Sequence, residues 1–363
     1  MTVGKLCRTA GSFSVSKGNP DLTWEKVKSS NIGADISLWN RIDLSVDVYN
    51  KTSDDLLYQK PLAATTGYSY IWMNAGSVRN RGVEFNLTTK NIVSGDFTWE
   101  TNLNMSFNKN KVLSLSDGST TFNPGNRLPI AAGHDMGEYN LPIWAGVNPE
   151  NGDPQWEKLV TATDGTVTKE LTNAYSSVQT TQSRQFTGKS ATPKFTGGFS
   201  NTLAYKGFSL SAFFNFVYGN WVYNDSRFYF DNDGLYESYN VMVLPKGMSR
   251  WEKPGDIATH PKPIVGGNKD SNQSSSRYLE DGSFIRLRNV RLGYTIPVSI
   301  IKRIGLSRAN VFVSGDNLWT GTKFTGTDPE VSFSRGDTEF TQGLSSIKYP
   351  ISRKFLFGIN FTL

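Results

Sequence analysis

The chain has 363 residues, of which 37% are hydrophobic and 13% aromatic, and its formal net charge is +6 at pH 7. Its apolar runs reach only about four residues, far short of the ~20 that a membrane-spanning helix needs, which excludes a helical membrane protein. One cysteine excludes a disulfide framework, two histidines leave little room for a metal site, and the scattered basic residues do not indicate a nucleic-acid partner. We expect neither a metal nor another cofactor.

The N-terminal segment, Met1 to Arg8, lacks the apolar core that a signal peptide requires. The chain is therefore either a cytoplasmic protein or a piece of a longer exported chain, and the rest of the sequence has to decide between the two. We expect residues 1–23 to form a lead-in loop.

Alternation of apolar and polar residues predicts β-strands along the rest of the chain. Ile42, Leu44 and Val46 alternate with polar residues, and the terminal run from Phe355 to Leu363 repeats the pattern. The runs are about 9–13 residues long, which is more than the ~5–6 of an ordinary strand and matches the ~9–11 of a tilted strand that crosses a bilayer. The eleven predicted strands are 24–39, 42–51, 78–90, 97–108, 141–148, 154–160, 193–205, 208–218, 284–297, 308–318 and 350–363.

The connections between these strands alternate in length. Short turns on one side and long loops on the other are typical of an outer-membrane barrel, and the polar face of each strand suits a watery lumen. The segment from Pro297 to Gly305 adds a possible helical turn between two strands. We therefore predict an all-β fold, an antiparallel transmembrane β-barrel piece with long extracellular loops, over residues 24–363. The long loops are expected at about 52–77, 108–140, 161–192, 219–280 and 319–348.

Aromatic residues gather near the predicted strand ends. Such positions are typical of the girdles that flank the apolar band of a membrane barrel, although ordinary packing of aromatic side chains explains each residue about equally well. The residues concerned are Trp39, Trp72, Trp99, Trp144, Tyr205, Tyr218, Trp221, Trp319 and Tyr349.

Ten short segments, in the same order along the chain, resemble the C-terminal part of SusC/RagA-type TonB-dependent outer-membrane transporters. Each is weak alone, and their joint order over most of residues 18–363 is specific. They are Gly18–Glu25, Asn31–Gly33, Val46–Leu57, Asn74–Phe85, Arg250–Trp251, Pro254–Asp256, Tyr278–Asn289, Ser314–Leu318, Gly326–Glu330 and Tyr349–Arg353.

The resemblance implies a 22-stranded barrel in the outer membrane of a Gram-negative cell, with its C-terminus on the periplasmic side and outer-membrane lipid around it. It also implies an N-terminal plug that TonB pulls, a SusD-like lipoprotein that caps the barrel, and import of oligosaccharides or peptides. The plug and the TonB-contacting segment have no counterpart here, so TonB is expected to act only through the missing N-terminal part. Because eleven strands are half of 22, we expect about half of such a barrel.

The last strand carries a further pattern. Gly358, Phe361 and Leu363 fit the spacing of the C-terminal signal that the assembly machinery of the resembled family reads, although that family usually ends on an aromatic residue. The alternative is that this is simply an amphipathic terminal strand.

The long loop 219–280 combines aromatic residues with Asn and Asp. Aromatic faces beside amides and carboxylates can stack on and hydrogen-bond to sugar rings or peptide side chains, so the loop is a candidate contact for substrate or for the lipoprotein cap. The alternative is a loop that folds on its own aromatic cluster. The candidate residues are Trp221, Tyr223, Phe228, Tyr229, Tyr236 and Trp251, with Phe230 and Tyr239 beside them.

No catalytic motif supports an enzyme. Asp231 to Gly234 hints at calcium but lacks the further ligands of an EF-hand loop, and a plain turn is the simpler interpretation. Asp328 and Glu330 resemble a glycosidase pair only by residue type, and a role in loop structure fits them better. Two other functions remain open: a structural or adhesive outer-membrane β-protein without transport, and a soluble β-rich carbohydrate-active enzyme.

Overall fold

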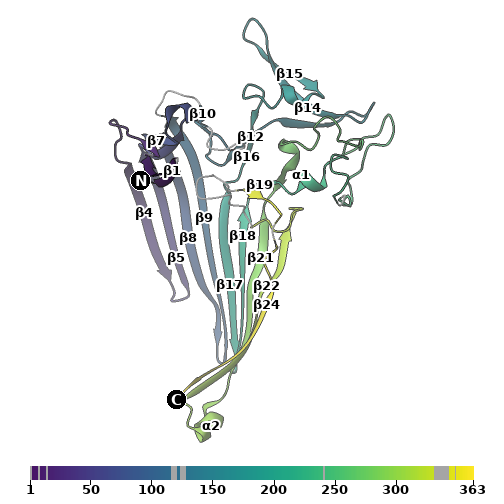
Figure 1. Ribbon diagram of the computed structural model, residues 1–363. Helices are drawn as coiled ribbons and strands as arrows, with labels where there is room; N and C mark the ends of the chain where they lie inside the picture. Colours follow the sequence, from purple (N-terminus) through teal and green to yellow (C-terminus); the bar gives the residue numbers. More distant parts are fainter. Residues whose placement is uncertain are drawn as a thin grey trace.

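The computed structural model describes residues 2–6, 9–13, 15–115, 121–122, 128–239, 242–330, 343–347 and 349–363. Its largest element within these residues is one nine-stranded sheet, called the wall below, in which every pair of neighbours is antiparallel (Figure 1). In spatial order the wall strands are β4 (Lys26–Leu38), β5 (Ile42–Asp54), β8 (Gly76–Ser94), β9 (Phe97–Leu115), β17 (Phe195–Tyr205), β18 (Phe208–Tyr218), β21 (Phe284–Thr295), β22 (Arg308–Thr322) and β24 (Lys354–Thr362).

Two of the eleven predicted strands do not join the wall. Residues 141–148 and 154–160 do contain strands, β13 (Ile143–Val147) and β14 (Pro154–Thr161), but these pair in a separate sheet with β15 (Val167–Thr172). With five and eight residues they are shorter than the ~9–11 that a strand needs to cross a bilayer. Their aromatic residues pack together instead, around the fully buried Trp156. The wall thus holds nine of the predicted strands.

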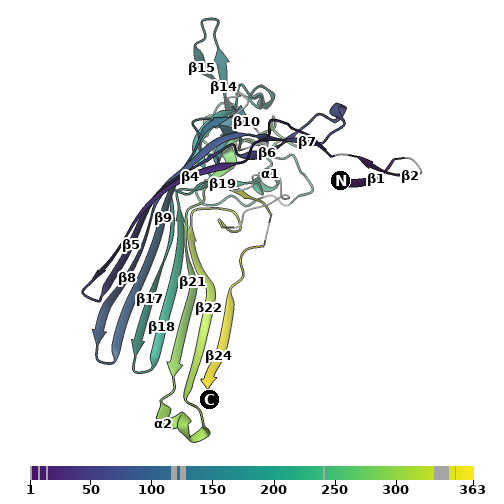
Figure 2. The ribbon, with the colours of Figure 1, turned by 90° about the vertical axis from the view of Figure 1, so that its left-hand side faces the viewer.

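The short turns and the long loops lie at opposite ends of the wall, as predicted. Both views place the C-terminus at the end with the short turns and the N-terminus among the long loops (Figures 1 and 2). The turn between β17 and β18 consists of Lys206 and Gly207, whose φ angles of 45° and 87° fit a tight turn with the twist of a hairpin. The predicted helical turn after Pro297 is also present, as α2 (Val298–Ile301) and η4 (Lys302–Ile304).

Shorter elements fill the long-loop end. The predicted lead-in loop contains a hairpin of β1 (Thr2–Leu6) and β2 (Thr9–Phe13), outside the wall. Two other small sheets have three strands each: one combines β3 (Ser16–Lys17), β6 (Leu57–Pro61) and β7 (Tyr70–Asn74), and the other combines β19 (Trp221–Asn224), β20 (Leu279–Asp281) and β23 (Leu344–Ser345). Two more are pairs of strands: β10 (Thr121–Phe122) with β11 (Ile130–Ala131), and β12 (Glu138–Leu141) with β16 (Gln185–Ser190). The short helices are η1 (Ala64–Thr66), η2 (Tyr175–Ser177), α1 (Arg227–Phe230) and η3 (Ser276–Tyr278).

The loops that follow β9, β18 and β22 assemble into one structure, called the head below: residues 128–194, 219–239, 242–283, 323–330 and 343–347. Its core contains Tyr139, Leu141, Tyr223 and Tyr278, all at most 1% exposed. No helix among the described residues is long and apolar enough to cross a membrane.

The strand register gives the wall one apolar face and one polar face, because side chains alternate between the two faces of a strand. One apolar row crosses six strands from partner to partner: Ile36, Leu44, Leu87, Leu103, Phe199 and Phe214. One step along the same strands, a polar row follows the other face: Asp35, Ser45, Asn86, Asn104, Gly198, Asn215 and Arg286. The alternation seen in the sequence is thus aligned across the sheet.

Candidate functional site: the polar face and the head

The polar face of the wall is hollowed in several places. A hollow of about 480 Å³ lies over β5, β8 and β9, and its lining includes Asp47, Glu84, Asn86 and Asn104. A second hollow of about 530 Å³ lies nearer the short turns, and its lining includes Arg291, which faces Ser211 and Ser314 across the strands. Amides, hydroxyls and charged groups line both, so this face can hydrogen-bond to a polar solute along its length.

Four rings of the head form an aromatic cluster after β19. Phe228, Tyr229, Tyr236 and Tyr239 contact each other with ring centroids 5.0 to 6.2 Å apart, and Tyr236 stacks on Tyr239 at 5.0 Å. The cluster is only partly buried, and Tyr239 is 48% exposed. Both sequence interpretations of this loop therefore apply to the same residues: the rings pack on each other and still offer aromatic surface to a ligand.

The other aromatic candidates of this loop lie elsewhere. Tyr223 is 1% exposed and belongs to the core of the head. Trp251 is 8% exposed, and its Nε1 donates to the carbonyl of Pro149 at 2.9 Å. Trp221 is half-buried, with the Lys189 ammonium 3.9 Å from its ring centroid. Only the four-ring cluster thus joins several of the predicted contact residues in one accessible place.

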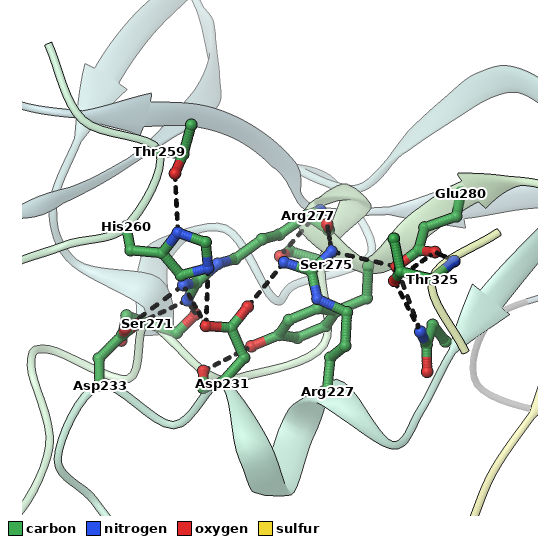
Figure 3. A network of polar contacts seen from close by, with 12 residues as sticks. Arg227, Asp231, Asp233, Thr259, His260, Ser271, Ser275, Arg277, Glu280 and Thr325 are labelled. Atoms are coloured by element: carbon green, nitrogen blue, oxygen red, sulfur yellow. Dashed lines mark hydrogen bonds and ion pairs between the residues drawn. The ribbon is translucent and has the colours of Figure 1, made fainter. Parts of the chain in front are cut away.

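The loop that carries the cluster also carries part of a buried network of charged residues (Figure 3). Asp231 is fully buried, and its two carboxylate oxygens lie 2.6 Å from Arg227 Nη2 and 3.3 Å from Arg277 Nη2. Arg277 also donates to Asp233 at 2.6 Å. His260 Nε2 lies 2.9 Å from Asp231 Oδ1, at an angle outside ordinary hydrogen-bond geometry. A buried carboxylate is thereby held by two guanidinium groups.

The network has the electrostatics of a structural ion-pair cluster. Burial alone would raise the pKa of Asp231, but the contact with His260 and the charges of Arg277 and Arg227 hold that pKa below its usual range. Burial would lower the pKa of Arg277, and the nearby Asp233 and Asp231 instead raise it. Both groups are therefore charged at neutral pH, and each compensates the charge of the other in the buried interior of the head.

Further contacts extend the network to other segments of the head. Arg227 donates to Glu280 at 3.2 Å, and Glu280 accepts from both the backbone and the hydroxyl of Thr325 at 2.8 Å. The guanidinium of Arg277 lies 4.8 Å from the ring centroid of Trp144, which attaches the small sheet of β13 to the same point. Five separate loop segments thus meet at these side chains: Trp144, residues 227–233, His260, residues 277–280 and Thr325.

Sequence reasoning missed this network. Its only visible signal was the pair of aspartates in Asp231 to Gly234, which suggested a turn with a hint of calcium. The structure shows the turn, and the carboxylates of Asp231 and Asp233 both accept hydrogen bonds from arginines. No group of three or more metal-binding side chains occurs in the described part of the chain. Nothing in the sequence marks Arg227 and Arg277, 50 residues apart, as partners of the same carboxylate.

A second ion-pair group joins the loop after β22 to the wall. Arg286, 2% exposed, pairs with Asp328 at 2.6 Å and with Glu330 at 3.0 Å. Arg288 pairs with the other oxygen of Glu330. The loop-structuring role expected for Asp328 and Glu330 fits this arrangement.

The proposed assembly residues lie on the edge strand β24. Phe361 and Leu363 project from the apolar face and are exposed, as are their neighbours Phe357 and Ile359. Gly358 lies on the other face, opposite Phe312. The ring of Phe312 packs over Gly358, and the guanidinium of Arg291 lies 4.0 Å from the centroid of the same ring.

Comparison with known proteins agrees with this architecture. The family described as TonB dependent receptor-like, beta-barrel, matches residues 3–318. TonB-dependent receptor P3 of Formosa agariphila is 32% identical over 94% of this chain and 34% of its own length. TonB-dependent receptor SusC of Bacteroides thetaiotaomicron is 25% identical over 94% of this chain and 32% of its own length. The solved structure of the RagAB peptide transporter superposes with a TM-score of 0.83 at 28% identity, over 99% of this chain and 38% of that one.

These matches have two consequences. The chain spans about a third of the length of the curated relatives it matches. The family consists of outer-membrane receptors and transporters and not of enzymes, so the alternative of a soluble carbohydrate-active enzyme is wrong. The nine-stranded wall, with its apolar and polar faces, is a piece of such a barrel, and this chain belongs to the TonB-dependent receptor-like β-barrel family, among the relatives of SusC and RagA.

Proposed function

We propose that this chain forms part of the wall and the extracellular loops of a TonB-dependent importer of oligosaccharides or peptides. The observation that carries the proposal is the likeness over nearly the whole chain to SusC and to a peptide transporter, combined with a polar face that is hollowed along its length. In this arrangement the apolar face contacts outer-membrane lipid, and the polar face lines the path of the solute. The C-terminus and the short turns lie on the periplasmic side.

The head would be the part that meets the solute first. The cluster of Phe228, Tyr229, Tyr236 and Tyr239 offers aromatic faces that can stack on sugar rings or on peptide side chains. It would serve either the substrate or a SusD-like lipoprotein that caps the barrel. The buried Asp231 network in the same loop supports either role, because it fixes the loop that carries the rings.

Uptake by the complete receptor that contains this chain tests the proposal. We expect cells to take up fluorescent oligosaccharides or peptides in a TonB-dependent way, and we expect Tyr236→Ala/Tyr239→Ala to reduce uptake severalfold. Tyr349→Ala is the matched control, because Tyr349 is 96% exposed and lies outside the cluster. Co-purification of the lipoprotein with the double variant separates the two roles: loss of the lipoprotein indicates the cap contact, and loss of uptake alone indicates the substrate.

Uptake of neither class of solute by the intact receptor would contradict the proposal. Adhesion or envelope integrity that depends on the receptor without any uptake would favour the structural or adhesive alternative.

A further inference from the structure

A group of four cations lies on the apolar face of the wall, at its long-loop end. Arg79 faces Lys111 and Arg81 faces Lys109 across β8 and β9. The next pair on the same face toward the short turns is Val83 and Phe107. Side chains two residues apart lie on the same face of a strand. The four cations therefore lie on the same face as the apolar residues, beyond the last apolar pair.

The charges of this basic group are not compensated within the described part of the chain. Arg81, Lys109 and Lys111 are exposed, and none of the four forms an ion pair with a residue that the structure describes. Asp54, an acid nearby on this face, already pairs with Lys28 at 3.0 Å. Like charges directly opposite each other on a sheet are destabilising, so the arrangement favours an external anion.

The position of the group indicates the kind of anion. At the same end of the wall, the strands β17, β18 and β22 carry Phe195, Tyr218 and Trp319, and Phe195 stacks on Tyr218 at 4.9 Å. Aromatic residues of this type mark the level where the hydrocarbon of a bilayer meets its headgroups. The basic group thus lies beside the headgroups and on the side of the barrel that faces lipid, not on the side that faces the solute.

We propose that Arg79, Arg81, Lys109 and Lys111 bind the phosphate groups of an anionic glycolipid in the extracellular leaflet of the outer membrane. A hollow of about 610 Å³ lies at this place, lined among others by Arg79, Arg81, Lys109, Val83 and Phe107. Its cationic side chains can hold phosphate oxygens in charge-assisted hydrogen bonds, while the apolar pair contacts the first carbons of the acyl chains. The inference rests on the proposed orientation of the barrel, with the long loops outside.

Lipid binding by the complete receptor in detergent, measured by titration in native mass spectrometry, tests this inference. The probes are bis-phosphorylated lipid A, the same lipid without its phosphates, and inorganic phosphate. We expect Arg81→Gln/Lys109→Gln to weaken the binding of the phosphorylated lipid roughly 30-fold, since each basic residue near a charged lipid surface contributes about fivefold. The charge-conserving Arg81→Lys/Lys109→Arg should restore most of the affinity and show that the barrel still folds.

Lys28→Gln is the matched control, because Lys28 lies on the same face and Asp54 already compensates its charge; we expect less than a twofold change. Equal binding of both lipid forms, or equal weakening of both by the neutral variant, would overturn the inference. If inorganic phosphate binds as tightly as the lipid, the assignment of the bound anion to a lipid is wrong. Capture of an acidic protein instead of lipid would overturn the inference as well. Uptake is measured on the same variants, so a receptor that binds lipid but imports nothing would refute the proposed function alone.

Discussion

The wall and the head are stabilised in different ways. In the wall, every strand pairs with the next wall strand along the chain, and a simple alternation of apolar and polar residues decides which face each side chain takes. In the head, contacts join residues far apart in the sequence: Tyr139 Oη donates to the carbonyl of Gly343, 204 residues away, and the Trp144 backbone donates to Ser276, 132 residues away. The wall therefore depends on a repeated pattern, whereas the head depends on particular pairs.

The largest effect is expected when these 363 residues are expressed alone. The edge strands β4 and β24, thirteen and nine residues long, each pair on one side only among the described residues. In lipid each unsatisfied backbone group costs several kcal/mol, so an open sheet is not stable there. We expect aggregation and no single-channel conductance from the chain alone, in contrast to the complete receptor. A stable conducting pore from the chain alone would show that the wall closes by itself.

Removing the central carboxylate of the head is expected to have the next largest effect. Asp231→Ala removes the carboxylate that the buried Arg227 and Arg277 share, leaving each with one acidic partner, Glu280 or Asp233, and breaking a buried ion pair costs about 3–5 kcal/mol. We expect rapid proteolysis of the loop around Asp231, while the wall keeps its heat-shifted gel mobility. Glu237→Ala, an exposed acid of the same loop, is the control and should behave as wild type. Loss of the wall together with the loop would show that the two regions are not independent.

A matched pair of arginine substitutions tests the two faces of the wall. Leu103 lies in the apolar row between Leu87 and Phe199, so Leu103→Arg should destabilise the barrel by about 2–4 kcal/mol. Its neighbour Asn104 lines the polar hollow beside Asp47 and Glu84, so Asn104→Arg should cost less than about 1 kcal/mol. Urea titration of the membrane-inserted receptor measures both. Equal costs would contradict the assignment of the faces.

The same contrast explains how far the sequence could be interpreted. Period-two alternation placed nine wall strands, their two faces and the alternating turns, because each depends on neighbours in sequence. It also placed two strands at 141–148 and 154–160, but it could not tell that they belong to the head. The available signal was the length of the predicted ranges, because both are shorter than the ~9–11 residues of a strand that crosses a bilayer. The Asp231 network could not be predicted from the sequence. Its partners, such as Arg277 and Asp233, lie 44 residues apart, and such a pair produces no periodic pattern in the sequence.

Acid should loosen the head before the wall. The pKa of folded Asp231 lies below the ordinary value of 3.8, so its contribution to stability is complete above about pH 4 and is lost as the pH falls through the lower, folded-state pKa. We expect proteolysis of the head to accelerate below about pH 4, as measured with an acid-stable protease. Asp231→Asn should remove most of this dependence. A wild-type profile that stays flat down to pH 3 would contradict the lowered pKa of Asp231, because the unfolded chain already takes up a proton at this carboxylate below about pH 4.

The smallest effect is expected at Gly358, where stability and assembly can be separated. A Cβ at this position would lie 2.4 Å from Cζ of Phe312. Gly358→Ala must therefore shift the ring of Phe312, which also contacts the guanidinium of Arg291. We expect a loss of about 1 kcal/mol, because overpacking strains the neighbours and the ring end can move partly aside. Gly18→Ala is the control, because no atom lies within 4 Å of the Cβ it would add.

If Gly358 acts only through packing, the variant should reach the heat-shifted form as fast as wild type and unfold at slightly lower urea. If Gly358, Phe361 and Leu363 are read during assembly, the heat-shifted form should appear more slowly in Gly358→Ala, and Leu363→Phe, which restores the usual aromatic end, should not slow it.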